Sequence, residues 1–415
     1  EVYARMGNWQ RVTQALERLV VMADSPAVKA AKMVALAAVV DTRLARPVDA
    51  ERLLTEARGI EPLGIEPIRG LAELYTRQHD GMALNVLLDQ TLAGHAAALE
   101  ADPDQPALYA NIYRILEMKT EDSLASLAVG VLDLIGTRGD FPDVPPDVVE
   151  VHWQGGARAG DGSLAELFCP KAIPAGLRET LRAVEEPIAR SLGASARQVD
   201  LPRDSRIDRK HPLMLQLNLL GPAFGIRGEI TCHAVATPGI RFAPGAPGIA
   251  LVPEGIASGE DQAAIMFAAG SILACAREGL ALATIVTEDR LRRLIAGLVR
   301  LAVPGSATAG IEPGELEEEV AFLRRALSDK IITRVAPFAF ECGSALERPA
   351  MRRNLITIAH RVGFVTTGSL TGALGALAVE HGRPPIPLAL LPGSGSLISF
   401  VFSKDHLELR RRIGL

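Results

Sequence analysis

The sequence feature that most constrains this chain is an uncharged stretch between Asp261 and Arg277. Its apolar residues fall on every side of a helical turn: Ala264, Ile265, Met266, Phe267, Ile272, Leu273 and Cys275. A helix that is apolar all round is buried in a core or lies in a membrane. Because a membrane span takes about 20 apolar residues, the stretch predicts a buried helix of a folded domain and no membrane insertion.

Short signals mark both ends of this predicted helix. Ser258 is followed three residues later by Asp261, which is a capping-box pattern. Arg277 and Gly279 are residues typical of the last turn and of the position after it.

The composition limits the kind of protein and its partners. A chain of 415 residues is too long for one ordinary core, so we expect two or three domains. Hydrophobic residues (48%) and charged residues (22%) predict a globular, soluble chain. The net charge of -5 argues against nucleic acid as a partner. Aromatic residues make up only 4%, so the cores must be aliphatic, which suits the packing of helices.

The cysteines and the first residue bear on localisation. Cys169, Cys232, Cys275 and Cys342 are far apart and form no C-x-x-C pair, which predicts reduced thiols in a cytoplasmic protein. The chain opens at Glu1, already inside a helical pattern, so we expect a fragment of a longer polypeptide. The absence of a signal peptide is then uninformative.

Residues 1–136 predict antiparallel helical hairpins. The segment YARMGNWQRVTQALERL resembles a tetratricopeptide repeat (TPR), in which a small residue such as Gly7 lets two helices approach closely. Joints recur at a spacing near the nominal period of about 34 residues: Gly7-Asn8, Arg46-Pro47, Asp80-Gly81 and Lys119-Thr120. An irregular helical bundle is the alternative. Candidate partner-binding residues on the repeat face are Tyr3, Trp9, Tyr75, Tyr109 and Tyr113.

Residues 137–174 are rich in Gly, Pro and Asp and predict a linker with one strand-like run, VVEVHW. The remaining residues, 175–415, predict an α+β domain with a small sheet. Its expected strands are Leu213–Leu220, Glu229–Ala236, Gly248–Val252 and a last one near the C-terminus. Helices are expected at about 175–192, 261–277, 291–301, 316–327, 350–362 and 368–381. The fold class is therefore mostly α, a TPR-like array followed by an α+β domain.

The second domain resembles the HtpX-like family of zinc metallopeptidases. The resemblance rests on a strand segment, CHAVATPGIRFAPGAPGIALVPEGI, followed by a buried helix, a helical insertion and a later helix containing Ala359-His360-Arg361. It covers roughly residues 205–380. The whole chain is also similar to large bacterial TPR proteins, common in myxobacteria, that end in a degenerate peptidase-like domain.

The residues that would bind zinc in this family are missing. The family's H-E-x-x-H places two histidines one turn apart and a glutamate as general base. In the preferred register the motif falls on Ser271-Ile272-Leu273-Ala274-Cys275, and in the other register on Ala268-Ala269-Gly270-Ser271-Ile272. The third ligand, a glutamate in the family, falls on Ile356. The resemblance thus implies a pseudoenzyme with no catalytic residue, metal or cofactor.

Other chemistry has weaker support in the sequence. A zinc site could form from Cys232, His233, Cys275 and His360 if the strand packs on the buried helix, although core or edge residues are the simpler interpretation. Four other histidines are expected to face solvent: His79, His95, His381 and His406. The glycine-rich run Pro392–Ser396 predicts a turn between strands more readily than a phosphate-binding loop.

Taken together, these patterns predict a non-catalytic scaffold whose helical array binds a protein or peptide. The alternative is a hydrolase or peptidase with a rearranged or metal-independent site, in which Ser271 would be the candidate nucleophile.

Overall fold

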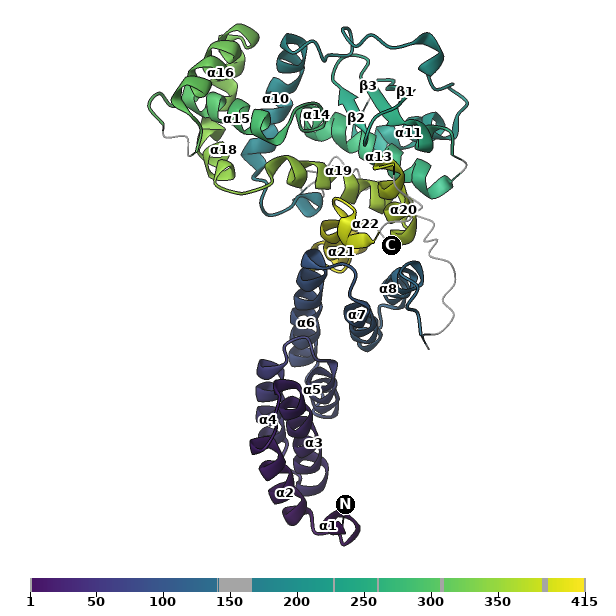
Figure 1. Ribbon diagram of the computed structural model, residues 1–415, viewed down its shortest axis with the longest axis vertical. Helices are drawn as coiled ribbons and strands as arrows, with labels where there is room; N and C mark the ends of the chain where they lie inside the picture. Colours follow the sequence, from purple (N-terminus) through teal and green to yellow (C-terminus); the bar gives the residue numbers. More distant parts are fainter. Residues whose placement is uncertain are drawn as a thin grey trace. The chain divides into compact units, whose positions relative to one another are not determined.

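The computed structural model describes residues 2–139, 141, 166–226, 228–259, 261–306, 310–382 and 387–413. The chain divides into two compact units, the first comprising residues 1–144 with 402–404 and the second residues 145–401 with 405–415. Helices dominate both units, and the described strands form one three-stranded sheet (Figure 1). The predicted fold class, mostly α with a small sheet, is confirmed. Most of the predicted linker 137–174, including VVEVHW, lies outside the described residues.

The first unit is a series of helices in which each packs on the next along the chain. They are α1 (Val2–Arg5), α2 (Trp9–Val21), α3 (Pro26–Leu44), α4 (Pro47–Ile60), α5 (Ile65–Arg77), α6 (Gly81–Ala101), α7 (Pro106–Met118) and α8 (Asp122–Leu134). Every predicted joint falls between two of these helices. We call α1 to α8 the helical arm.

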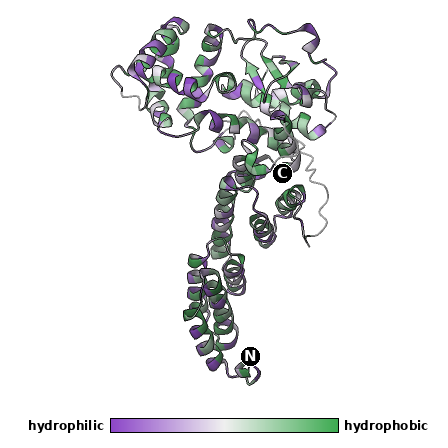
Figure 2. Ribbon diagram, viewed as in Figure 1, coloured by the Kyte–Doolittle hydropathy of each residue, from purple (hydrophilic) through white to green (hydrophobic). Residues whose placement is uncertain are grey.

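Local sequence signals set the ends of the arm helices. The side chains of Asn8, Ser25 and Asp80 each accept a hydrogen bond from the first turn of the following helix. Proline occupies the start of α3, α4 and α7, where its missing N–H costs nothing. Figure 2 shows hydrophobic and hydrophilic residues interleaved along these helices, as expected for helices that bury one face.

Glycine has two different roles in the arm. Gly7 does not sit at a close helix contact, because a Cβ added there would meet nothing within 4 Å. It has φ +66°, so the turn between α1 and α2 favours glycine for its left-handed backbone. Close approach occurs instead at Gly70 of α5, where a Cβ would lie 2.7 Å from a methyl carbon of Leu54 in α4.

His95 is fully buried in α6, which corrects the expectation that it faces solvent. Its ring nitrogens lie 2.9 Å from the carbonyl oxygen of Thr91 and 3.1 Å from that of Leu63. Burial lowers the pKa of His95, while the two backbone carbonyls act in the opposite direction, and the ring connects α6 to the loop before α5.

The second unit contains the sheet and a larger set of helices. Its helices of eight or more residues are α10 (Ala175–Ser191), α11 (Pro212–Leu220), α13 (Gln262–Glu278), α15 (Glu288–Ala302), α16 (Pro313–Ala326), α18 (Ala339–Leu346), α19 (Met351–Thr367), α20 (Leu370–Glu380), α21 (Ser394–Val401) and α22 (Lys404–Ile413). Shorter helices are α12 (Glu254–Ala257), α14 (Ala281–Ile285) and α17 (Asp329–Val335), with single 3-10 turns η1 (Arg203–Ser205), η2 (Gly221–Phe224), η3 (Ala336–Phe338) and η4 (Leu388–Leu390). Within this unit the sheet lies at one end and α15, α16 and α18 at the other (Figure 1).

The sheet has the strand order β1-β3-β2. β1 (Thr231–Val235) runs parallel to β3 (Ile249–Pro253), and β2 (Arg241–Ala243) runs antiparallel to β3. The strands expected at 229–236 and 248–252 correspond to β1 and β3, whereas β2 was not predicted. Cys232 faces the core opposite Ala250, and both are fully buried.

Two segments predicted as strands are helices. Residues 213–220 form α11, which buries Leu213, Met214, Leu217 and Leu220 at helical spacing and leaves Leu215 and Leu219 exposed. The C-terminal segment forms α21 and α22, so Pro392–Ser396 leads into a helix and does not join two strands. His406 of α22 is buried, not exposed as expected, and its ring N–H donates to the Val401 carbonyl at 2.7 Å.

The buried helix predicted from the uncharged stretch is α13. Phe267 and Ile272 have no exposed surface, and the buried residues cover all sides of the helix. Asp261, not Ser258, is the N-cap residue, and its carboxylate accepts from the Ala263 N–H at 2.9 Å. Gly279 ends the helix with φ +70°.

The closest helix packing in the unit joins α13 to α19. A Cβ on Gly270 would lie 2.9 Å from the Gly363 Cα and 2.1 Å from Thr366 Oγ1. The Ser271 hydroxyl donates across the contact to the Ala359 carbonyl at 3.2 Å. The Thr366 hydroxyl lies 3.0 Å from the Met266 carbonyl of α13 and 2.8 Å from the Gly363 carbonyl of its own helix. Ser271 therefore bonds to the neighbouring helix and not to its own. We call this region the glycine contact.

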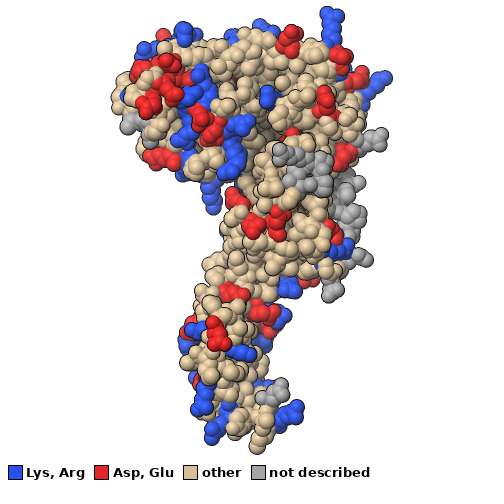
Figure 3. All heavy atoms as spheres, viewed as in Figure 1, with Lys and Arg blue, Asp and Glu red and all other residues tan. Residues whose placement is uncertain are grey.

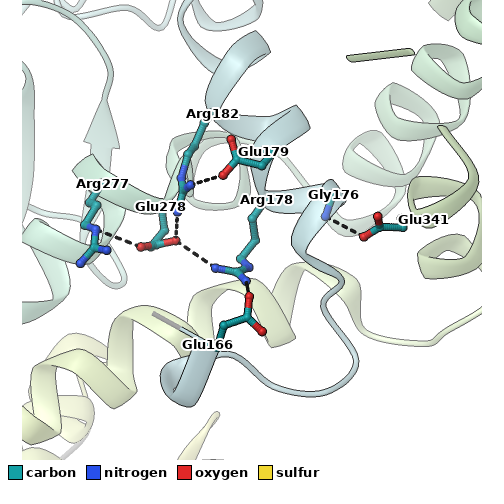
Figure 4. A network of polar contacts seen from close by, with 8 residues as sticks. All are labelled: Glu166, Gly176, Arg178, Glu179, Arg182, Arg277, Glu278 and Glu341. Atoms are coloured by element: carbon teal, nitrogen blue, oxygen red, sulfur yellow. Dashed lines mark hydrogen bonds and ion pairs between the residues drawn. The ribbon is translucent and has the colours of Figure 1, made fainter. Parts of the chain in front are cut away.

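A buried polar network fixes the C-terminal end of α13 to α10 (Figure 4). The Glu278 carboxylate accepts hydrogen bonds from Arg178, at 3.4 Å, and from Arg182, and it lies 3.3 Å from Arg277 Nε. Arg178 also donates to Glu166 at 2.9 Å. A carboxylate at a helix C-terminus is repelled by the negative end of the helix dipole. The three arginines neutralise the Glu278 carboxylate and so stabilise the end of α13.

Ion pairs also join α15 to α16, where Figure 3 shows acidic and basic side chains gathered. Arg290 Nη1 lies 3.2 Å from the buried carboxylate of Glu319, and Arg293 Nη1 lies 3.6 Å from Glu315. The side of α15 away from these ion pairs carries the predicted apolar stripe, in which Leu291 and Leu294 are buried.

Replacing Gly363 by alanine tests the glycine contact. The new Cβ would lie 2.6 Å from Ser271 Oγ and 2.7 Å from the Phe267 carbonyl oxygen, so α13 and α19 must separate. We expect Gly363→Ala to lower the free energy of unfolding by about 1–3 kcal/mol, as overpacked cores do. Gly343→Ala in α18 is the matched control, because a Cβ there meets nothing within 4 Å. Urea denaturation of both variants measures the difference, and an equally stable Gly363→Ala variant would contradict the close contact.

Candidate functional site

A cavity of about 350 Å³ lies inside the second unit. Its walls come from the segment leading into β2, from α13 and α14, from the first turns of α19, from the end of α20 and from the loop before α21. The residues that line the cavity include Ile240, Arg241, Ser271, Cys275, Leu280, Arg352, Arg353, Ile356, His360, Glu380 and Gly393.

The cavity gathers the positions that the metallopeptidase resemblance assigns to a zinc site. Ser271 and Cys275 stand at the histidine positions of the preferred register, Ile356 stands at the third-ligand position, and all three line the cavity. In the other register the histidine positions are Ala268 and Ile272, which are fully buried and do not line it. Only the preferred register would therefore place both of its histidine positions on the cavity.

The side chains at these positions do not fit a catalytic zinc ion. The Ser271 hydroxyl donates to the Ala359 carbonyl, and Ile356 offers no ligand atom. Cys275 is the one possible zinc ligand among the three, and a catalytic zinc site takes three protein ligands. Among the described residues no group of three or more His, Cys, Asp or Glu side chains is gathered for a metal ion.

The four-residue zinc site considered from the sequence is not assembled. Cys275 and His360 do line the same cavity, but Cys232 and His233 do not. His233 lies on β1, where its Nδ1 is 2.9 Å from Ser205 Oγ. Cys232 is fully buried in the sheet, so strand β1 contributes no ligand to the cavity.

A buried histidine and a buried glutamate face each other at the cavity. His360 Nε2 lies 3.8 Å from Glu380 Oε2, which is too long for a hydrogen bond. Burial lowers the pKa of His360 to about 3, with His381 acting in the same direction, and raises the pKa of Glu380 to about 8. Both side chains are therefore neutral at pH 7, since burial disfavours each charged form.

Ser271 lacks the surroundings of an activated nucleophile. A serine nucleophile needs a base within hydrogen-bond distance of its hydroxyl group. His360 Nε2 faces Glu380, and His360 Nδ1 is buried without a hydrogen-bond partner in the described part of the chain. Gly393 packs against that nitrogen, with its would-be Cβ 3.1 Å away.

The candidate binding residues of the arm have different surroundings. Tyr3 is 46% exposed, and Trp9 is partly exposed beneath the Arg43 guanidinium, 4.7 Å from the ring centroid. Tyr75 is partly exposed and donates to Glu51 at 2.8 Å; burial and this hydrogen bond raise its pKa to about 12. Tyr3 and Trp9 therefore lie on the first two helices of the arm, and both have exposed surface.

The remaining two tyrosines differ from each other. Tyr109 has no exposed surface and donates to the Pro103 carbonyl at 2.8 Å, so it is a core residue and not part of a binding face. Tyr113 is partly exposed, donates to Glu117 at 2.8 Å and packs edge-on against Phe141. The five residues are thus spread along the arm and do not form one cluster.

Sequence reasoning missed Glu380 and the three arginines of the cavity. Glu380 had a signal, because it is the single charged residue in the apolar run LTGALGALAVE. Arg352 and Arg353 also had one, because basic residues are unfavourable in the first turn of a helix.

Comparisons with protein-family models, with curated proteins and with solved structures find no match. In the described part of the chain, no helix has the length and apolar character needed to span a membrane.

The pKa of Glu380 predicts a pH-dependent stability difference. Its folded-state pKa, about 8, lies above the ordinary value of 4.5, so the protonated acid stabilises the fold at low pH and this stabilisation is lost as the pH rises toward 8. Glu380→Gln has no proton to lose, so the variant should gain stability over the parent by a few kcal/mol between pH 5 and about 8. Urea denaturation at several pH values measures this gain, and Glu318→Gln on the exposed side of α16 is the control. A constant difference would contradict a buried, neutral Glu380.

Proposed function

We propose that this chain is a non-catalytic interaction protein. The helical arm binds a protein or peptide partner, and the second unit is a peptidase-like domain without hydrolytic zinc chemistry. One observation carries the proposal: Ser271, Cys275 and Ile356 line a single cavity, and they do not supply the two imidazoles and the carboxylate that the family's zinc site needs.

The arrangement of the arm supports the binding part of the proposal. Each arm helix packs on the next, as in TPR-type arrays, whose extended faces bind partners while neighbouring helices supply the core. Tyr3, Trp9 and Tyr75 are open to solvent in whole or in part. The net charge of -5 favours a protein over a nucleic acid as the partner. Four free, buried cysteines agree with a cytoplasmic location, which is part of the proposal.

The competing function is a hydrolase with a rearranged site, and it has less support. Such an enzyme would need a base beside Ser271, but the described hydrogen bond of this hydroxyl is to the Ala359 carbonyl. Ser271→Ala should therefore leave partner binding unchanged.

Metal analysis tests the pseudoenzyme part of the proposal. The chain should purify without stoichiometric zinc, and a chelator should leave its melting temperature unchanged, because a bound structural or catalytic metal would stabilise the fold. Elemental analysis of the parent and of His360→Ala measures this. One equivalent of zinc in the parent that is lost in His360→Ala would overturn the proposal.

Partner binding tests the role of the arm. Truncating an aromatic hot-spot residue of an interface reduces the binding free energy by about 2 kcal/mol or more, which weakens binding more than tenfold. The double variant Tyr3→Ala, Trp9→Ala should therefore lose the partner that the parent chain retains from its own cell extract, while its circular dichroism spectrum stays helical. Leu219→Ala is the matched control, because Leu219 is 71% exposed and lies on α11 of the second unit. Equal retention of the partner by both variants would contradict binding at the first hairpin.

A further inference from the structure

The cavity of the second unit carries a concentration of positive charge that the proposed function does not use. Arg241 of β2 and Arg352 and Arg353 of α19 all line it. In the described part of the chain, none of these three guanidinium groups forms an ion pair, and Arg352 Nε is buried without a hydrogen-bond partner. Other arginines of this unit, such as Arg178 and Arg290, are paired with carboxylates.

Glu288 is the carboxylate near this charge. Its two oxygens accept from the Met351 and Arg352 backbone N–H groups, both at 2.8 Å. Glu380 is the acidic residue among those that line the cavity, and burial keeps it protonated at pH 7. Burial lowers the pKa of Arg352; the Glu288 charge opposes this shift, and the Arg241 charge, a smaller influence, adds to it. Glu288 therefore offsets part of the positive charge, while Arg241 and Arg353 add to it from the same lining.

The two arginines of α19 stand at a helix end whose N–H groups the Glu288 carboxylate caps. Arg352 and Arg353 lie in the first turn of the helix, where the dipole is already positive and cations are disfavoured. A fold tolerates such an arrangement more readily when an anion binds there, because guanidinium groups recognise carboxylates and phosphates through paired hydrogen bonds.

Much of the remaining lining is apolar or hydrogen-bonded. Ile240, Leu280 and Ile356 present aliphatic surface. The hydroxyl of Thr284 accepts from the Phe242 N–H at 3.0 Å and donates to the Ala281 carbonyl, and that of Thr357 donates to the Arg353 carbonyl. The volume of about 350 Å³ falls within the range of small-molecule sites, which are mostly apolar with a few placed polar groups.

We propose that this cavity binds a small amphipathic anion, with one carboxylate or phosphate group held by Arg241, Arg352 and Arg353 and an apolar body against Ile240, Leu280 and Ile356. The site is independent of the partner of the arm. It is a ligand site of the peptidase-like domain and involves no bond-making step.

Calorimetric titration with defined probes tests this proposal on the full chain. The anionic probes are 4-phenylbutyrate and phenyl phosphate, which distinguish a carboxylate from a phosphate head group, and the neutral probe is 4-phenylbutyramide. At least one anion should bind saturably, and the amide should bind at least tenfold more weakly than the acid. Arg352→Gln should weaken the binding of the anion at least tenfold.

Two further variants keep the test decisive if Arg352→Gln proves unstable. Arg353 is exposed, so Arg353→Gln removes a cavity charge with little effect on packing, and it should also weaken the anion. Arg324→Gln on the exposed side of α16 removes the same charge away from the cavity and should leave binding unchanged. The proposal is overturned by equal binding of acid and amide, by unchanged affinity in both cavity variants, or by no saturable binding of either anion at millimolar concentrations.

Discussion

The second unit depends on the close packing of α13 against α19 at the glycine contact. Gly270 and Gly363 have no side chains between the two backbones, and the Ser271 hydroxyl donates to a carbonyl oxygen of the opposite helix. The Ser271 hydrogen bond favours one register of the two helices, because a shift would separate this buried hydroxyl from the Ala359 carbonyl. The cavity lies beside this contact, so the packing of α13 on α19 positions the two walls that these helices form.

Much of the helical structure could be predicted because its signals are local. The uncharged run of α13 leaves no polar face, so exposing any side of this helix to water would be unfavourable and it is buried on all sides. The joints of the arm were marked by turn and capping residues such as Asn8, Pro47 and Asp80, which act on the backbone within one turn. The predictions that failed concern short apolar runs. In LMLQLNLL the apolar residues fit both the alternating pattern of a strand and the spacing of a helix. Pro212 in the first turn and the His211 side chain, which caps the Leu213 N–H, favour the helix.

The candidate site could be predicted only in part. The metallopeptidase resemblance pointed to Ser271, Cys275, Ile356 and His360, and the structure brings these four residues to one cavity. The arginines and Glu380 come from segments far apart in the chain, and their meeting depends on tertiary packing that no local pattern encodes. Burial of His95, Tyr109 and His406 was missed for the same reason, since each has an amphipathic side chain that suits a core or a surface equally.

The glycine contact has a consequence for how this domain could change by mutation. A Cβ on Gly363 would lie 2.6 Å from Ser271 Oγ and 2.7 Å from the Phe267 carbonyl oxygen, and a Cβ on Gly270 would lie 2.9 Å from the Gly363 Cα. Neither glycine can gain a side chain while α13 and α19 keep their present distance. Ser271, one position along from Gly270, lines the cavity. Sequence drift that reshapes the cavity is therefore open to position 271 and closed to the two glycines beside it.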